Sequence, residues 1–478
     1  MKYPDIEFDP FFAWFNRPRI MYAPGVRSEV GYEMGELGGT KAVIYTDKGL
    51  VKAGVSEMVA EAVRDSDLEL VGIFDDIVQD ARIDIINKGA EFYRKCGADC
   101  LIAVGGGSVM DTAKAVNIMI GRKIDDFQPL ADLAALWEGA KPLPPHIVFP
   151  TTAGTGSEVT NAIVALDVEN EVKLAISHPY NADIAMLDPE LTVALPPKIT
   201  GFTGMDALTH AIEGVTSTSA EPIADAMGLH AIRLIFKYLP IAVKDPENIE
   251  ARGHMLIASS LAGLCFGNTM TGGVHATAHA LGGKYGIPHG LANAIMLDIV
   301  MDFNVEEVPL RFLMIADAMG INVNGKDPVE AGREAVQAVR DLKADIGLTD
   351  SLKDFDIPEG REELMPLVEL AAADSQISYN PRYLEEEDIL NLYLLSCDSH
   401  NGIKFVGPGA RGVIGRKTHG QGRLFVRLAL ASLNLSSPAV YPERAVGSIL
   451  RIIEPYKLID LLQTLGEIFN FGSFLKHF

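Results

Sequence analysis

The stretch LIAVGGGS, residues 101–108, ends an apolar run of strand type with three consecutive glycines, and DTAKA at 111–115 continues with the composition of a helix. A strand that passes through glycines into a helix leaves backbone N–H groups free at the helix N-terminus. Glycine also lets a pyrophosphate come close, because it has no Cβ atom. The stretch is not a G-x-G-x-x-G fingerprint, since Met110 stands at the third glycine position. A tight turn is the alternative, but the strand and helix on either side favour a phosphate-binding loop.

A second loop with glycines and hydroxyls follows the apolar run HIVFP at 146–150. It reads PTTAGTGSE from Pro150 to Glu158. Hydroxyls and amides together suit a ribose or a phosphate. The alternative is a helix cap, in which Ser157 caps the next helix. Taken together, the two loops favour a dinucleotide as the ligand.

Asp47 stands just after the run KAVIYT at 41–46. An acid in this position can accept hydrogen bonds from a ribose diol and repel a 2′-phosphate, which favours NAD over NADP. The alternative is an aspartate that starts a turn before a helix.

The chain of 478 residues divides into three regions by pattern. In residues 1–195, strand-type runs such as LELVGIF at 68–74 and CLIAV at 100–104 alternate with helical patterns, which predicts an α/β domain with a parallel sheet covered by helices. In residues 196–395, apolar residues recur with helical periodicity, which predicts an all-helical domain. Residues 396–478 form a basic extension of unknown role. From Ser399 onward it has ten Lys and Arg against four Asp and Glu, so residues 1–398 carry a net charge of −29.

Charge and cysteine content argue against several classes of protein. A net charge of −23 disfavours nucleic acid and anionic membranes as partners, because such a surface repels phosphate. The four cysteines fit neither a disulfide framework nor a zinc knuckle, which predicts free thiols. The N-terminus carries acids and proline where a signal peptide needs a basic start, and no run approaches about 18 uninterrupted apolar residues. We therefore expect a cytoplasmic protein without a membrane anchor.

Five potential metal ligands fall in two short segments. Asp206 and His210 are four residues apart in a helical pattern, which places both on one face. His275, His279 and His289 fall within fifteen residues, and the first two are again one helical turn apart. Buried histidines bonded to the backbone are the alternative, but three of eleven histidines in so short a stretch favour metal binding. A carboxylate with three imidazoles suits Fe(II) or Zn(II) and leaves a position open for a substrate oxygen.

Four motifs resemble the iron-containing (group III) alcohol dehydrogenase family: GGGSVMDTAKA, PTTAGTGSE, GMDALTHAIE and VHATAHALGGKYGIPHGLAN. The likeness runs from about residue 15 to residue 394. It implies an N-terminal dinucleotide-binding α/β domain and an all-α metal-binding domain, in a dehydroquinate synthase-like architecture with the site in the cleft between them. It also implies metal-dependent, reversible hydride transfer between a primary alcohol or diol and NAD, giving the aldehyde. A polyol or glycerol dehydrogenase and a hydroxyacid–oxoacid transhydrogenase are alternatives on the same scaffold, and a non-catalytic assembly protein is a more remote one.

The resemblance also implies roles for individual residues. Asp206, His210, His275 and His289 would ligate the metal, and His279 is the candidate for proton relay. The implied NAD contacts are Asp47, Gly106, Gly107, Ser108, Thr151, Thr152 and Lys173, to which we add Asp111 and Lys114 from the helix after the glycines. The expected partners are a small alcohol or aldehyde and further copies of the chain in a homo-oligomer.

The sequence departs from the family pattern in three places. VQDAR at 78–82 stands where an Asn-Pro-Thr stretch often follows the third strand, so we expect the loop near the adenosine or the cleft rim to differ. Gly214-Val215 stands in place of the more usual Ala-Tyr, which is expected to alter local packing. The extension after about residue 395 has no counterpart in the common pattern. The first two departures leave the predicted metal ligands untouched.

Overall fold

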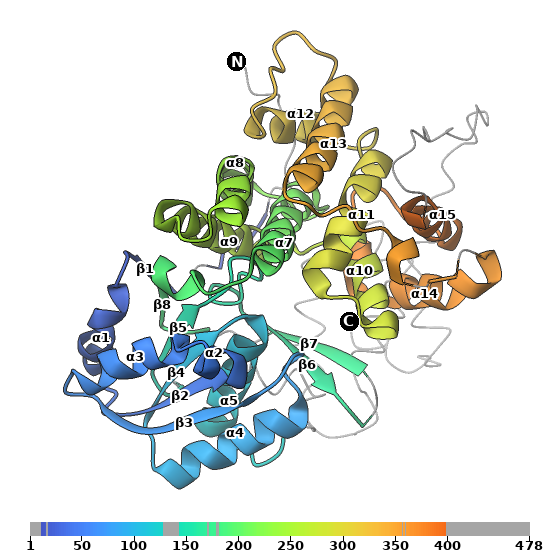
Figure 1. Cartoon of the computed structure of the whole chain (residues 1–478). Coiled ribbons are helices and arrows are strands. Elements are labelled where there is room, and N and C mark those ends of the chain that lie inside the picture. Colours follow the sequence, from blue (N-terminus) through green and yellow to red (C-terminus); the bar gives the residue numbers. More distant parts are fainter. Residues whose placement is uncertain are drawn as a thin grey trace, which may run out of the picture. The chain divides into compact units, whose positions relative to one another are not determined.

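The computed structural model describes residues 11–15, 18–127, 143–169, 172–177, 181–355, 357–358 and 360–397, without the side chains of 172–175 and 177. The predicted basic extension therefore lies outside the described residues, apart from residues 396 and 397. Figure 1 shows a sheet with helices on both of its faces in the first part of the described chain, followed by a group of helices.

Six parallel strands form the sheet, as the alternating pattern predicts. Along the sheet they are β1 (Arg19–Tyr22), β8 (Ile184–Leu187), β5 (His146–Pro150), β4 (Cys100–Gly105), β2 (Lys41–Asp47) and β3 (Glu69–Ile77). Every residue of β4 and β5 is buried, which fits their nearly continuous apolar sequences.

Successive side chains of a strand point to opposite faces, and β2 uses both. Ala42 and Ile44 pack with α1 (Val30–Glu36) and α3 (Val55–Arg64) on one face. Val43 and Tyr45 pack with α4 (Ile83–Cys96) and α5 (Gly107–Arg122) on the other. The Tyr45 hydroxyl donates to the carbonyl of Gly89 in α4 at 2.8 Å, so the ring's one polar atom is satisfied inside the core.

An antiparallel hairpin interrupts the strand–helix alternation. It consists of β6 (Ala162–Asp167) and β7 (Val172–Ser177), which pair only with each other among the described strands. The loop at 150–158 leads into β6, so the alternative that Ser157 caps a helix is wrong. Three short elements complete this part of the chain: the 3₁₀ helices η1 (Val26–Glu29) and η2 (Pro189–Thr192), and α2 (Lys48–Lys52).

No strand follows Leu187 among the described residues, which agrees with the predicted helical region. Proline stands in the first turn of several of these helices, where its missing N–H costs no hydrogen bond. The helices are α7 (Pro197–Thr216), α8 (Pro222–Lys244), α9 (Ile249–Thr269), α10 (Gly273–Tyr285), α11 (His289–Asn304), α12 (Pro309–Ala318), α13 (Pro328–Asp345), α14 (Arg361–Ala373) and α15 (Glu386–Cys397), with the 3₁₀ helices η3 (Leu352–Phe355) and η4 (Ser375–Tyr379).

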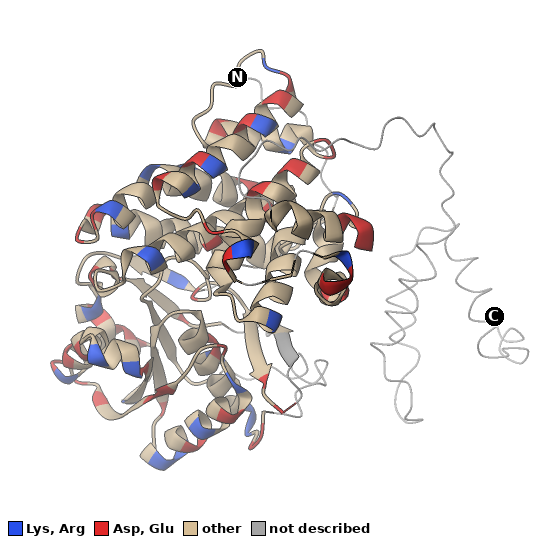
Figure 2. Ribbon diagram, turned by 45° about the vertical axis from the view of Figure 1, so that its right-hand side comes forward, with Lys and Arg blue, Asp and Glu red and all other residues tan. Residues whose placement is uncertain are grey.

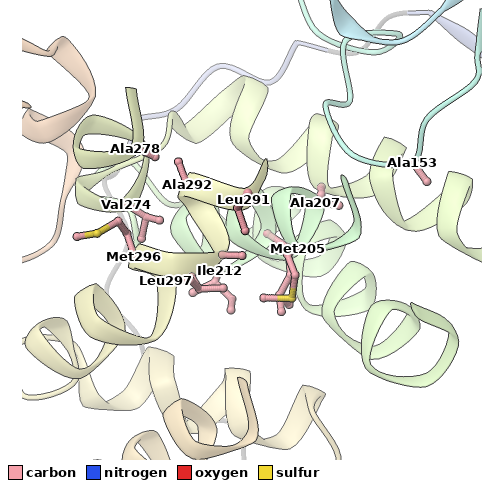
Figure 3. Packing of buried hydrophobic residues seen from close by; sticks show 14 of the residues in the cluster. Ala153, Met205, Ala207, Ile212, Val274, Ala278, Leu291, Ala292, Met296 and Leu297 are labelled. Atoms are coloured by element: carbon pink, nitrogen blue, oxygen red, sulfur yellow. The ribbon is translucent and has the colours of Figure 1, made fainter. Parts of the chain in front are cut away.

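Apolar side chains hold α7, α10 and α11 together. Figure 3 shows Ile212 of α7, Val274 of α10 and Met296 and Leu297 of α11 gathered between these helices. All four are at most 2% exposed. The outer helices carry the charged residues, whereas the strands of the main sheet are largely free of charge (Figure 2).

Helix α8 is long and apolar enough to span a membrane by length and composition alone. It packs against α7 and α9, and its buried residues include Leu229, Ile232, Ile235 and Leu239. One face of α8 is therefore buried against its neighbours, which accounts for many of its apolar residues.

The departure at Gly214 has a packing reason. A Cβ atom at this position would lie 2.5 Å from the Sγ atom of Cys265 on α9 and 3.1 Å from the Oγ1 atom of Thr269. Glycine at 214 therefore lets α7 and α9 pack closely in this chain.

The loop at 150–158 is fixed against α9 by a contact between two glycines. Gly156 has φ +60°, and a Cβ atom there would lie 2.6 Å from the Cα atom of Gly263. Ser260 of α9 donates to the buried Glu158 carboxylate at 2.7 Å. These contacts join the loop that follows β5 to the helical region.

We expect Gly156→Ala to lower the free energy of unfolding by about 3 kcal/mol, since it combines a left-handed residue with a backbone overlap. Gly25→Ala is the matched control, because Gly25 has φ +73° and no atom within 4 Å of its added Cβ. The control should cost about 1 kcal/mol. Urea unfolding of both variants measures the difference, and equal losses would show that the contact with Gly263 is unimportant.

Candidate metal centre and cofactor site

Helix α7 presents three polar residues on one buried face. Asp206, His210 and Glu213 follow one another at intervals of four and three residues, which places them in line along the helix. All three are at most 5% exposed. Polar groups buried to this degree need partners, and those partners come from other elements.

Helices α10 and α11 bring in the histidines. α10 ends at Gly286 with φ +67°, and Pro288 directs the chain into α11, which begins at His289. A Cβ atom at Gly290 would lie 2.4 Å from the carbonyl oxygen of Phe202, so the first turn of α11 lies directly on α7. The Gly-Ile-Pro break thus returns His289 to the helix that carries Asp206.

The four predicted metal ligands converge. One ligand atom each from Asp206, His210 and His275 lie within 4.8 Å of one another. The Oδ1 atom of Asp206 is 4.0 Å from Nε2 of His275 and 3.4 Å from Nε2 of His289. The first three side chains are buried, whereas that of His289 is 40% exposed. The cluster therefore has one accessible side.

The protonation states suit metal ligation. Burial lowers the pKa of His210, and burial with neighbouring imidazoles holds the pKa of His275 well below its usual value. Both rings are therefore neutral near pH 7 and can offer a lone pair to a cation. One carboxylate oxygen and three imidazole nitrogens form a donor set that fits Fe(II) or Zn(II).

Each buried imidazole is oriented by a partner at Nδ1. His210 Nδ1 lies 3.3 Å from the carbonyl oxygen of Gly154, and its ring stacks on Phe266 with 4.1 Å between centroids. His275 Nδ1 lies 2.5 Å from an oxygen of Glu213. With Nδ1 donating, Nε2 of each ring is the nitrogen left to bind an ion.

Asn293 lies in the same cluster, although no prediction named it. Its Nδ2 atom donates to Oδ1 of Asp206 at 2.7 Å and lies 3.3 Å and 3.2 Å from Nε2 of His275 and His289. It stands one turn after His289 on α11, so the spacing of four residues is a signal that sequence reasoning could have used.

His279 lies beside the cluster and has a carboxylate partner of its own. Its Nδ1 atom is 2.7 Å from Oδ2 of Asp374, and its ring stacks on His289 with 5.3 Å between centroids. Burial raises the pKa of Asp374, but its hydrogen bonds with His279 and with the amide of Gln376 outweigh this effect and lower the pKa overall. Asp374 is 95 residues away in sequence, and no pattern near it indicated the pairing.

The predicted NAD contacts gather at one edge of the sheet. Strands β5, β4 and β2 are parallel neighbours in the sheet. Thr151, Gly106 and Asp47 stand at their carboxyl ends, which lie side by side. The N-cap residue of α5, Gly106, offers no side chain to its first turn. Gly106 and Gly107 also make room for the second loop, since added Cβ atoms would lie 3.3 Å from Thr152 and 2.9 Å from Thr155.

One hydroxyl in this region has no partner. Among the described residues, the Oγ1 atom of Thr152 is buried and makes no hydrogen bond. A buried hydroxyl without a hydrogen-bond partner lowers stability. Since Thr152 lies where the second loop meets Gly106, a ligand bound there could supply the missing partner. Ser108 Oγ accepts from the amide of Asp80 at 3.1 Å, which leaves its own hydrogen free to donate to a ligand.

Asp47 and Asp111 have roles within the protein. The Asp47 carboxylate caps α2 by accepting from the amide of Leu50 at 3.0 Å, as expected for an aspartate that starts a turn before a helix. Its second oxygen can still accept a hydrogen bond from a ligand. Asp111 accepts from Ser157 Oγ at 2.6 Å and from the amide of Val164 at 3.0 Å. It ties α5 to the second loop and to β6.

The Lys114 side chain also bonds to groups within the protein, and Lys173 is only partly described. The Lys114 ammonium group lies 2.9 Å from Asp111 and 3.1 Å and 2.5 Å from the carbonyl oxygens of Ser157 and Ala162. These contacts use all three of its donors, so the geometry gives no support to a phosphate contact by Lys114. Lys173 pairs with Leu166 in the hairpin, and its side chain lies outside the described residues.

Family models cover most of the described chain. Residues 17–189 match the model for iron-containing alcohol dehydrogenase, and residues 200–396 match that for the C-terminal part of the Fe-containing alcohol dehydrogenase family. The chain belongs to the iron-containing alcohol dehydrogenase family. It is therefore an oxidoreductase, and the resemblance inferred from its motifs is confirmed.

Individual iron-containing alcohol dehydrogenases are similar over nearly their whole length. The chain is 37% identical to 1,3-propanediol dehydrogenase of Klebsiella pneumoniae over 78% of its own length and 95% of that protein. It is 35% identical to the NAD-dependent methanol dehydrogenase of Bacillus methanolicus, over 79% and 98%. A crystal structure of sulfoacetaldehyde reductase from Bifidobacterium kashiwanohense in complex with NAD+ has a TM-score of 0.72 and 32% identity, over 82% and 100%.

Thr152→Val tests the cofactor side of this iron-containing alcohol dehydrogenase. We expect about 5- to 10-fold weaker NAD binding with no loss of stability in the ligand-free protein, because the hydroxyl has no partner to lose there. Calorimetric titration with NAD and urea unfolding measure the two effects. The control is Thr216→Val on α7, whose hydroxyl donates to Ile212 at 2.9 Å and which should lose about 1 kcal/mol of stability while NAD binding is unchanged. Unchanged NAD affinity in Thr152→Val would place the cofactor elsewhere.

Proposed function

We propose that this enzyme transfers a hydride reversibly between a small primary alcohol or diol and NAD, with one divalent metal ion held by Asp206, His210, His275 and His289. The observation that carries the proposal is the convergence of these four side chains on one point with a single accessible side. The carbonyl of Gly154 contacts His210, so the loop expected to bind NAD directly adjoins the metal ligands.

When bound, the metal ion supplies Lewis acidity that favours the deprotonated alcohol, and NAD supplies the hydride acceptor. Iron is the metal that the family name indicates, although Zn(II) binds such donors more tightly than Fe(II) by the Irving–Williams order. Asp206 contributes the negative charge, and His210 and His275 are neutral ligands in a dry environment that strengthens every electrostatic interaction.

His279 is the group we assign to the proton. Its Nδ1 atom is held by Asp374, so Nε2 is free to accept the proton of the alcohol. The His279 side chain is 34% exposed, whereas that of His275 is 4% exposed. His279 can therefore pass the proton to solvent at the edge of the cluster.

Similar proteins guide the choice of substrate. They include 1,3-propanediol dehydrogenases, a methanol dehydrogenase and lactaldehyde reductases, and also a choline dehydrogenase and a long-chain-alcohol dehydrogenase. We infer a primary alcohol or diol for this chain, with glycerol or another polyol as the alternative that the same site would serve. A cytoplasmic location and a homo-oligomeric state remain predictions.

The test is NAD reduction by a panel of primary alcohols and diols, with metal-stripped protein reconstituted with Fe(II), Zn(II), Mn(II) or no metal. We expect turnover that depends on one metal and falls at least about 100-fold in His275→Ala. The control is His254→Ala, because His254 stacks on Tyr238 of α8 away from the cluster and should keep its activity. Equal turnover with and without metal would refute the metal site, and no turnover with any alcohol would favour the transhydrogenase.

His279→Gln tests the proton path. We expect kcat/KM to fall roughly 100-fold, and its pH profile to lose one ionisation, because glutamine cannot exchange a proton near neutral pH. Asp374→Asn should lower kcat/KM less, since it weakens the orientation of the ring and leaves the imidazole in place. A pH profile of His279→Gln with the ionisations of the wild type would exclude this role.

A further inference from the structure

Glu213 is a buried carboxylate that the proposed mechanism does not use. It stands on α7 one turn after His210 and is 5% exposed. Both of its oxygens reach α10: Oε1 accepts from the amide of Val274 at 2.6 Å, and Oε2 lies 2.5 Å from Nδ1 of His275. A polar group buried to this degree needs partners, and Glu213 finds them on α10.

Glu213 lies close to Gly272, the residue before α10. A Cβ atom at Gly272 would lie 3.1 Å from Oε1 of Glu213. The N-cap residue of α10 is this same glycine, so it has no side chain to cap the helix. Glu213 therefore supplies the cap from another helix, through the amide of Val274.

The second contact determines which nitrogen of His275 carries hydrogen. With Oε2 as the acceptor in this contact, Nδ1 carries the hydrogen and Nε2 keeps its lone pair. Nε2 is the atom that faces Asp206, at 4.0 Å from Oδ1. His210 differs, because a neutral carbonyl group faces its Nδ1 atom.

We propose that Glu213 is a positioning residue that caps α10 and holds His275 in the tautomer that binds the metal. The proposal rests on the metal centre of the proposed function. A carboxylate behind an imidazole ligand fixes the ring and raises the basicity of the ligating nitrogen, and the loss of such a partner typically weakens metal binding about 10- to 100-fold. Glu213 thereby links α7, which carries two predicted ligands, to α10, which carries a third.

Glu213→Gln tests the proposal with little change in shape. The amide oxygen can still accept from Val274, but the amide N–H group then faces Nδ1 of His275 and favours hydrogen on Nε2. We expect Co(II) to bind about 10- to 100-fold more weakly, measured by competition with a chelator and by the visible absorption of bound Co(II). The matched control is Glu221→Gln, since Glu221 is 3% exposed and caps α8 through both oxygens without touching a predicted ligand. Its Co(II) affinity should equal that of the wild type.

Two further variants distinguish positioning from general loss of structure. In the His275→Ala background, Glu213→Gln should weaken Co(II) binding no further, because its effect acts through that ring. Glu213→Asp keeps the carboxyl group and should bind Co(II) more tightly than Glu213→Gln.

Each contrary outcome has a definite meaning. Wild-type affinity in Glu213→Gln, a further loss in the His275→Ala background, or an Asp variant no better than the Gln variant would overturn the role of Glu213 while leaving the metal centre intact. A wild-type protein that binds no Co(II) would overturn the metal centre itself, and this inference with it.

Discussion

Buried polar groups must be paired, and this constraint shapes the centre of the enzyme. Asp206, His210 and His275 are removed from water by α7, α10 and α11, and each finds a partner on a different element from its own. Apolar packing brings the three helices together, but the polar contacts determine their register. The shift of any one helix by a turn would separate a ligand from its partner and leave both buried without a hydrogen bond.

Much of the fold could be predicted because its signals are local. The apolar runs at 41–46, 100–104 and 146–150 become β2, β4 and β5, and helical periodicity after residue 196 becomes helices throughout the described part. The hairpin of β6 and β7 was not anticipated, because two amphipathic strands look alike whether they join the main sheet or pair with each other. Asp111 and Lys114 of α5 bond to backbone groups of β6, and these contacts span about 50 residues.

The candidate site divides in the same way. The residues expected as metal ligands lie in motifs whose helical spacing places them on common faces, and the structure brings them together. Their supporting residues come from elsewhere: Asp374 reaches His279 across 95 positions, and Glu213 reaches His275 across 62. Lys114 was predicted from its place in the helix after the glycines, and its side chain contacts the carbonyl groups of Ser157 and Ala162.

The contact between the carbonyl of Gly154 and Nδ1 of His210 makes one peptide group common to two binding sites. The loop cannot move away from the helices without loosening a predicted metal ligand, and a Cβ atom at Gly154 would lie 2.7 Å from Thr203 of α7. Thermodynamic linkage makes any coupling between two such sites reciprocal. If the dinucleotide changes the affinity for the ion by some factor, the ion changes the affinity for the dinucleotide by the same factor. The proposed ion and dinucleotide would then be heterotropic effectors of each other, and the contact between Gly154 and His210 is a direct route between their sites.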